Sequence, residues 1–254
     1  MGLDSATMLV LRKTKLAETD LIVTGFSDEG RQVRAVAKGA RRPGSKLGAH
    51  LELYSVARVL LRKGRRLDLV TEAFGIDSNS ACRADVLHSA GAAAVVELLD
   101  KVSADGDTEA RLFPLACAAL RSVGAVPDEG VPLVTAAAVL KISAQLGFRP
   151  SFVRCACCGG AEGGAMPAFS FEQGGVICER CLPGLPEGGG GRRDARLVGW
   201  AEVLLNGRFG DLERHADGEH AALGRELLAF SREWLRFHLV DRLRSLDFLL
   251  NFPV

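Results

Sequence analysis

The sequence contains no run of about 18 to 20 uninterrupted apolar residues, the length that a membrane-spanning helix requires. At the N-terminus, Asp4 comes early and the first basic residues follow only a short apolar run, which is the wrong order for a secretory signal. Ala6 stands where a myristoylation motif needs Ser or Thr. We therefore expect a cytoplasmic protein without membrane contact.

Motifs of familiar enzyme classes are missing as well. The chain has neither H-E-x-x-H nor G-x-S-x-G, and no pair of carboxylates lies in a recognisable catalytic frame. The five histidines are scattered, and we expect surface or packing roles for them: His50, His88, His215, His220 and His238. Nothing in the sequence indicates catalysis, so we expect a protein that is not an enzyme.

A nucleotide-binding loop is only approximated. Gly39, four further residues and then Gly44-Ser45-Lys46 nearly match a P-loop, which requires Lys directly after the second glycine, then Ser or Thr and a helix. Here Ser45 precedes Lys46, the residues that follow look like a strand, and Pro43 lacks an amide for a phosphate. We reject the P-loop.

The first 80 or so residues have the pattern of a small β-barrel. Five short strands are expected, at residues 7–16, 20–27, 31–39, 51–64 and 65–76. Asp28-Glu29-Gly30 is a three-residue hairpin turn that ends in glycine, and Gly64 marks a second hairpin. Alternation in 31–39 puts Val33, Ala35 and Ala37 on one face, and Arg34, Val36 and Lys38 on the other.

The net charge of +1 conceals a strongly basic segment. Nine Lys or Arg residues lie between positions 38 and 66, and Glu52 is the only acid among them. Such a cluster favours phosphate-rich or acidic partners, although a solvated strand face is the simpler interpretation of a charge run. Aromatic residues are scarce before residue 80, and we expect Phe26 and Phe74 in the core. The surface therefore suits a phosphate backbone, with sequence-tolerant binding that salt weakens.

After Ser80 the apolar residues recur at helical spacing. Helices are expected within 83–102, 107–124, 132–147, 193–207 and 218–250. The first presents Val86, Ala90, Ala93, Val96 and Leu99 at that spacing. The other details expected are a cap at Asp107 or Thr108, a kink at Pro114, a start at Pro132, a stop at Gly147 and a flexible connector at 187–193.

Five of the seven cysteines crowd between positions 155 and 181. Cys155/Cys158 and Cys178/Cys181 form two C-x2-C pairs, and the spacing between the pairs is typical of four-cysteine zinc sites. Four thiolates close a tetrahedron without an open position, so we expect one structural zinc ion. Disulfides conflict with the cytoplasmic interpretation, and a thioredoxin-like pair would need a βαβ unit. Cys157 is either an occasional substitute ligand or a free thiol. Cys82 and Cys117 are expected to be buried packing residues.

Four segments carry a resemblance to a known family. They are LRKTKLAETDLIVTGFSDEGRQVRAVAKGARRPGSKLG (11–48), LGFRPSFVRCACCG (146–159), FSFEQGGVICERC (169–181) and LRSLDFLL (243–250). In this order, and over essentially its full length, the sequence resembles the RecO family of bacterial recombination and repair proteins. The resemblance implies an α+β chain with an N-terminal OB-fold barrel (1–80) and a helical domain (81–254) interrupted by a zinc-ribbon-like element (151–191).

The resemblance also implies a function. RecO-like proteins bind single- and double-stranded DNA, anneal strands coated by single-stranded DNA-binding protein (SSB), contact the SSB C-terminal tail, and act with RecR to load RecA. A nucleoid-associated location follows. Lys38, Arg41, Arg42 and Lys46 match the family's basic motif and are the first expected DNA contacts. The second group, placed by alternation alone, is Arg34, Arg62, Lys63, Arg65 and Arg66. Lys141 and Arg149 lie in sequence suited to the SSB tail.

Two other functions stay open at this point. One is a zinc-ribbon adaptor that bridges partners without direct DNA contact, in which the basic strands are merely solvated. The other is a nuclease or another DNA enzyme. DNA binding that depends on the basic residues separates the adaptor from the mediator, and cleavage in the presence of divalent metal identifies the enzyme.

Overall fold

The computed structural model describes residues 3–104, 109–160, 166–186, 191–192 and 194–252. The chain divides into two compact units, Met1–Ala125 and Val126–Val254, which we describe separately. The first unit therefore includes helical sequence beyond residue 80. The domain limits implied by the family resemblance remain predictions.

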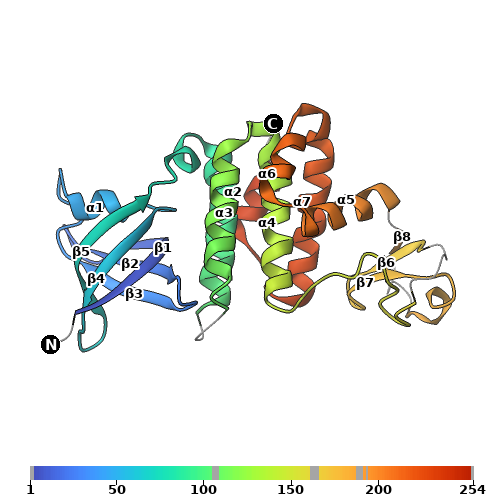
Figure 1. Ribbon diagram of the computed structural model, residues 1–254, viewed down its shortest axis with the longest axis horizontal. Helices are drawn as coiled ribbons and strands as arrows, with labels where there is room; N and C mark the ends of the chain where they lie inside the picture. Colours follow the sequence, from blue (N-terminus) through green and yellow to red (C-terminus); the bar gives the residue numbers. More distant parts are fainter. Residues whose placement is uncertain (1–2, 105–108, 161–165, 187–190, 193, 253–254) are drawn as a thin grey trace. The chain divides into compact units, whose positions relative to one another are not determined.

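A closed five-stranded barrel forms the start of the first unit (Figure 1). Its strands are β1 (Leu3–Lys15), β2 (Leu21–Ser27), β3 (Gln32–Ala37), β4 (Val56–Arg62) and β5 (Asp68–Asp77), joined in the order β1-β2-β3-β5-β4. All neighbours are antiparallel except β3 and β5. The first half of β1 pairs with β4 and the second half with β2, so this one long strand closes the barrel. The predicted OB-like barrel is confirmed.

The interior follows the period-two alternation of the strands. Ala35 and Ala37 are fully buried, while Arg34 and Lys38 are exposed, as expected for 31–39. Phe26 is also buried, which confirms its predicted place in the core. The same prediction for Phe74 is wrong, because its side chain is 44% exposed on the outer face of β5.

The basic segment contains a short helix where a strand was expected. Helix α1 (Lys46–His50) starts at the N-cap Ser45, whose hydroxyl accepts a hydrogen bond from the Gly48 amide at 3.1 Å. Serine satisfies an amide that the helix itself leaves unpaired, so this local bond overrides the strand-like appearance of the sequence.

Two longer helices complete the first unit. Helix α2 (Val86–Val102) is capped by Asp85 and follows the 3-10 turn η1 (Ser80–Arg83); α3 spans Leu112–Ala125. Val86 is 53% exposed and Ala93 half-buried, so only Ala90, Val96 and Leu99 of the expected set are buried. Pro114 is the third residue of α3, where the helix needs no amide hydrogen bond, so the expected interior kink is wrong. The cap expected at 107–108 lies outside the described residues.

The second unit is built on α4 (Val131–Gln145), which packs against α7 (Ala221–His238). Twelve residues of α4 are buried, so it is a central helix, and Pro132 occupies its first turn as expected. The remaining helices are α5 (Ala195–Asn206), α6 (Phe209–Leu212) and α8 (Arg244–Asn251), with 3-10 turns η2 (Asp128–Gly130), η3 (Leu182–Gly184), η4 (Glu213–His215) and η5 (Gly218–His220).

The helix expected over 218–250 is interrupted. Helix α7 ends where the amides of Leu239 and Val240 both donate to the Leu235 carbonyl, and α8 starts after the buried Leu243. Among the described residues, no helix is both long enough and apolar enough to cross a membrane.

A small sheet lies between α4 and α5 in the sequence. It contains β6 (Ala168–Ser170), β7 (Gly175–Ile177) and β8 (Gly191–Arg192), in the order β7-β6-β8. Of the connector predicted at 187–193, only Gly191 and Arg192 belong to the described residues, and they form β8.

Candidate functional site

The first predicted basic group lies in the connection between β3 and α1, which we call the basic loop (38–46). Its four cations are all exposed: Lys38, Arg41, Arg42 and Lys46. In the barrel register, Leu21 pairs with both Ala37 and Lys15, so this loop lies at the same end of the barrel as the β1–β2 turn. The structure therefore brings the first-choice residues together on one exposed loop.

Asp20 anchors this loop at its start. Its carboxylate accepts a hydrogen bond from the Gly39 amide at 2.8 Å and another from the Thr19 hydroxyl at 3.0 Å. These two bonds, with Lys38 and Arg42 nearby, hold the pKa of Asp20 below its usual value. Asp20 thus fixes the loop and also places one negative charge beside the cations of the loop. Because Asp20 lies outside 38–66, the charge count of that segment did not include it.

Arg41 has a second contact with the β1–β2 turn. Its guanidinium donates to the carbonyl oxygens of Ala17 at 3.2 Å and Glu18 at 2.6 Å. Arg41 is therefore partly engaged in holding the loop in place, while its side chain remains exposed.

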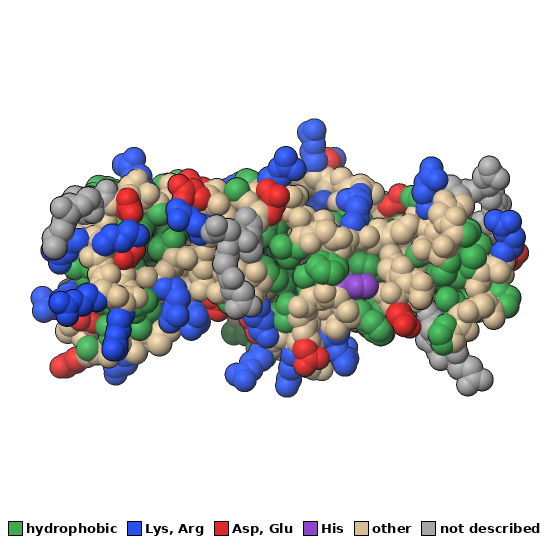
Figure 2. All heavy atoms as spheres, turned by 90° about the horizontal axis from the view of Figure 1, so that it is seen from below, with side chains coloured by type: hydrophobic (Ala, Val, Ile, Leu, Met, Phe, Trp, Pro, Cys, Tyr) green, Lys and Arg blue, Asp and Glu red, His purple; other side chains and the backbone are tan. Residues whose placement is uncertain are grey.

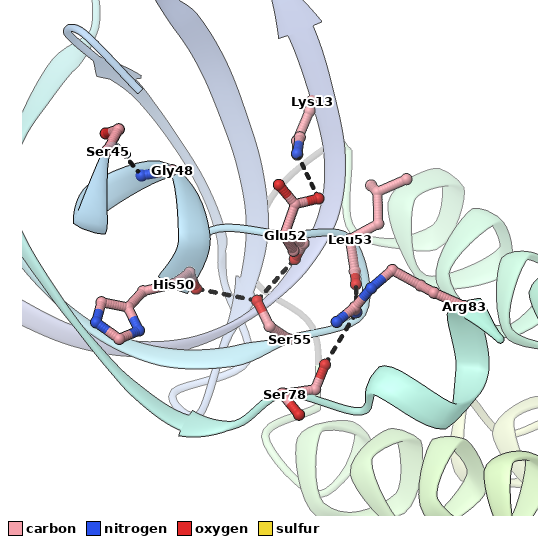
Figure 3. A network of polar contacts seen from close by, with 9 residues as sticks. All are labelled: Lys13, Ser45, Gly48, His50, Glu52, Leu53, Ser55, Ser78 and Arg83. Carbon is pink, nitrogen blue, oxygen red and sulfur yellow. Dashed lines mark hydrogen bonds and ion pairs between the residues drawn. The ribbon is translucent and has the colours of Figure 1, made fainter. Parts of the chain in front are cut away.

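The far side of α1 is fixed by the polar network drawn in Figure 3. The Ser55 hydroxyl hydrogen-bonds to the His50 and Glu52 carbonyls at 3.0 and 2.7 Å, and Lys13 contacts the Glu52 carboxylate at 2.7 Å. Arg83 donates to the carbonyl of Leu53 at 2.5 Å and to that of Ser78 at 2.9 Å. These bonds leave α1, and Lys46 at its start, little freedom to move.

The second basic group lies at the other end of the barrel (Figure 1). Arg62, Lys63, Arg65 and Arg66 are exposed at or beyond the end of β4, where Arg62 pairs with Leu3 at the start of β1. Arg34 joins them across a groove of about 660 Å³ that it lines together with Lys63 and Arg66. The structure thus separates the nine predicted contacts into two groups.

Acidic side chains reduce the charge of this second group. Lys63 lies 3.5 Å from both Asp4 and Asp68, and Glu29 also lines the groove. Figure 2 shows Lys and Arg side chains over the barrel with acidic ones among them. These carboxylates therefore offset part of the positive charge of the second group.

Arg58 was counted in the basic segment but not chosen as a contact. It pairs with Phe74 across β4 and β5, and its guanidinium carbon lies 5.4 Å from the centre of the Phe74 ring. Strand alternation alone places Arg58 outside, since Ala57 and Val59 are buried. Strand alternation did not indicate in the same way that Phe74 is exposed.

In the second unit, Cys155, Cys158, Cys178 and Cys181 form one cluster. Their four Sγ atoms lie within 4.8 Å of one another, and those of Cys158 and Cys178 are 3.9 Å apart. A tetrahedral zinc ion with Zn–S bonds of about 2.3 Å needs sulfur–sulfur distances of about 3.8 Å. The four predicted ligands therefore fit a zinc ion.

Hydrogen bonds around the cluster favour the thiolate form of Cys155 and oppose the thiolate form of Cys181. Burial opposes ionisation of Cys155, but the amides of Cys178, Cys158 and Cys157 outweigh it and lower its pKa to about 6. Cys181 donates its hydrogen toward Cys178 and Cys158, which raises its pKa to about 12. Four adjacent thiolates repel one another, and a bound divalent cation would relieve that repulsion.

Cys157 does not belong to this cluster. Its side chain is exposed, and its Sγ lies 3.9 Å from the Gln173 amide oxygen. The group that could hold a metal ion is thus formed by the two C-x2-C pairs. Cys82 and Cys117, in the first unit, are buried as predicted, and burial raises the pKa of each thiol to about 11.

Barrel, helices and cysteine cluster together describe a two-unit α+β protein with a basic OB-like barrel and a candidate metal centre. Two family descriptions match the chain: "Recombination protein O N terminal" at residues 1–79 and "Recombination protein O C terminal" at residues 83–247. The chain belongs to the RecO family.

Individual relatives agree with this assignment, and those compared here are named "DNA repair protein RecO". The protein of Desulfitobacterium hafniense (strain DSM 10664 / DCB-2) is 36% identical over 181 residues, which are 71% of this chain and 65% of the relative. That of Roseiflexus sp. (strain RS-1) is 32% identical over 68% of this chain and 60% of its own. For these two, the match spans less than two thirds of the relative. The Frankia casuarinae protein is 34% identical over 95% of this chain and 96% of its own.

Proposed function

We propose that this chain is a recombination mediator in DNA repair that binds single- and double-stranded DNA and acts without catalysis. It anneals complementary strands coated by SSB and, together with RecR, promotes RecA loading. The observation that carries the proposal is the basic loop, where four exposed cations are held on an anchored connection at one end of an OB-like barrel. Membership of a family whose named relatives are DNA repair proteins supports the same function.

Annealing requires no bond chemistry. A cationic surface that neutralises phosphates on two strands lowers their mutual repulsion and raises their local concentration. The basic loop provides the first contacts, and the second group, from Arg34 to Arg66, provides further contacts at the other end of the barrel. Binding of this kind tolerates any sequence and weakens steeply with salt.

The metal has a structural role in this proposal. One zinc ion held by the four clustered cysteines would tie residues before β6 to residues after β7, since the first C-x2-C pair precedes β6 and the second follows β7. All four positions of the tetrahedron are taken by protein, which leaves none for water or substrate.

The SSB tail requires an apolar pocket with a cation for its terminal carboxylate. Lys141 fits this role less well than its sequence indicated, because it is engaged by the carbonyls of Leu205 at 3.0 Å and Gly207 at 2.5 Å, and burial lowers its pKa to about 8. Arg149 donates to the Asn206 side chain at 2.5 Å. A second candidate is a hollow of about 290 Å³ beside α7 and α8, lined by leucines and by Arg232, Arg236 and Arg242. Asp241 and Asp247 line it as well, and Asp247 pairs with Arg232 at 3.6 Å and with Arg242 at 2.6 Å, so Arg236 is the cation we propose for the carboxylate.

The test is annealing of complementary strands precoated with SSB, followed over a salt series. The protein should accelerate annealing, and the acceleration should fade as salt rises. Reversing the charges of Lys38, Arg41 and Arg42 to Glu should abolish the acceleration and reduce the salt slope of DNA binding by about 3.

A matched control reverses three exposed arginines of the second unit, Arg196, Arg208 and Arg214, which makes the same change in net charge. That variant should anneal like the wild type. Unchanged DNA binding by the basic-loop variant would refute this assignment of the DNA contacts, whereas absence of DNA binding by the wild type would favour the adaptor function. Metal-dependent cleavage of labelled DNA, which we do not expect, would contradict the absence of catalysis.

A further inference from the structure

The outer face of β4 and β5 carries an aromatic side chain with a cation against it. Phe74 is 44% exposed, and Arg58, its register partner on β4, lies with its guanidinium carbon 5.4 Å from the ring centre. A cation over a ring face at this distance restrains both side chains. The pair is therefore a planar surface that is already oriented before any ligand binds.

The strand that carries Phe74 is paired with another strand mainly on one side, and α1 lies against it near Gly75. Among the described strands, β3 pairs with β5 only at Asp68 and Leu69, so from Val70 onward β5 has a strand neighbour on the β4 side alone. Ile76, at an irregularity in the pairing of β5 with β4, is 60% exposed. A flat ligand can therefore approach the exposed ring from solvent at the outer face of β5, where Arg58 lies against it.

Charge and size decide which ligand fits. Glu72 lies on the same face and is exposed, so it repels a phosphate placed directly over this part of β5. A protein interface buries about 800 Å² on each partner, more than Phe74 and Ile76 can contribute. A nucleobase is uncharged, planar and about the size of one ring, and it stacks equally well on an aromatic ring or a guanidinium plane.

We propose that Phe74 and Arg58 form a stacking platform for one unpaired base of a single strand. The inference rests on the proposed DNA binding and adds a specific source of preference for unpaired DNA. Bases inside a duplex are already stacked and cannot reach the platform, whereas phosphate contacts at the basic loop serve both forms. The platform thus gives a preference for single strands, whereas the cations of the barrel bind single strands and duplexes alike.

The experiment compares three DNA ligands with the full chain: oligo(dT), an abasic strand of equal length and a mixed-sequence duplex. A sample without DNA is the blank. Phe74→Ala should weaken oligo(dT) binding by roughly 5- to 150-fold, the range of one lost base stack. Its affinity for the duplex and for the abasic strand should stay within about twofold of wild type, with an unchanged salt slope, because no phosphate contact is lost. Ile76→Ala is the matched control, since it removes a neighbouring exposed apolar side chain without removing a ring.

A direct readout comes from Phe74→Trp. This variant should retain oligo(dT) affinity, and the fluorescence of its added indole should be quenched by oligo(dT) but not by the abasic strand. Equal losses on all three DNAs, or no loss in Phe74→Ala, would overturn the platform while leaving DNA binding intact. If Phe74→Ala lost binding to a protein partner but kept its affinity for oligo(dT), the platform would also be refuted. Absence of DNA binding by the wild type would instead refute the proposed function itself.

Discussion

Gly48 is the contact through which α1 controls the position of the basic loop. A methyl group built on this glycine would lie 2.1 Å from the carbonyl oxygen of Ala40 and 3.5 Å from the Ser45 side chain. Carbon and oxygen atoms do not approach that closely, so Gly48→Ala forces α1 and the Ala40 segment apart by about 1 Å. The surrounding hydrogen bonds at Ser45 and Ser55 resist that movement.

The cost follows from the size of the displacement. Inserting a methyl group into a closely packed site typically costs about 1 to 3 kcal/mol, which corresponds to a fall in Tm of roughly 4 to 12 °C for a unit of this size. Arg41 and Arg42 directly follow Ala40, so the displacement also moves the proposed phosphate contacts. We expect DNA affinity at temperatures well below Tm to fall, with a salt slope reduced by about 1 to 2.

Two assays separate the stability effect from the effect on binding. Thermal denaturation gives the first, and a salt series of DNA affinity at low temperature gives the second. Ala49→Gly, at an exposed position of the same helix, costs about 1 kcal/mol of helix propensity without a clash and should leave the salt slope unchanged. A Gly48→Ala protein with the wild-type Tm and salt slope would refute the packing argument.

Three further predictions concern single residues. Asp20→Asn keeps an acceptor for the Gly39 amide but removes a negative charge beside the loop, so DNA binding at low salt should tighten by a few-fold, as titration would show. Cys178→Ser should release the metal and expose the small sheet to protease, whereas Cys157→Ser should retain a full complement on metal analysis. Asp85→Ala removes the α2 cap and should cost about 0.5 to 2 kcal/mol in urea unfolding at neutral pH. Burial raises the pKa of Asp85, but its bonds to His88 lower the pKa by more, so the folded protein has a pKa below the ordinary 3.8. The stability difference between wild type and Asp85→Ala should therefore be complete at pH values above 3.8 and be lost as the pH falls through the lowered pKa.

Local rules were enough to predict most of the barrel. The Asp28-Glu29-Gly30 turn fixes the β2–β3 hairpin, because Gly30 adopts a φ of +82° that other residues disfavour. Alternation then determines which side chains are buried in β3. Prediction failed at α1, where the capping bond of Ser45 competes with strand propensity, and at Phe74, where burial depends on whether a neighbouring strand covers the face. The cap is a local signal that was outweighed, whereas the exposure of Phe74 is not encoded in a short window of sequence.

The cysteine cluster was predictable for a different reason. C-x2-C spacing brings two thiols to one side of a tight turn regardless of the rest of the fold, so the ligand pairs can be read from the sequence. The choice between Cys157 and its neighbours depends on the backbone of the first turn. Gly159, with a φ of +70°, returns its amide to the Cys155 carbonyl at 2.8 Å, and the structure places the Cys157 thiol outside the cluster.

The sequence could not reveal that the basic residues form two separate groups. Lys46 and Arg62 are close in sequence, but the long β1 strand pairs its start with Arg62 and its end with β2, so the pairing of β1 places the two groups at opposite ends of the barrel. Strands β4 and β5, which carry Arg58 and Phe74, run between those ends. A single strand bound at both groups can therefore pass over the proposed stacking platform, whereas the paired bases of a duplex cannot reach it. On this arrangement, the strength of binding comes from the ends of the barrel, and the preference for unpaired DNA comes from the face between them.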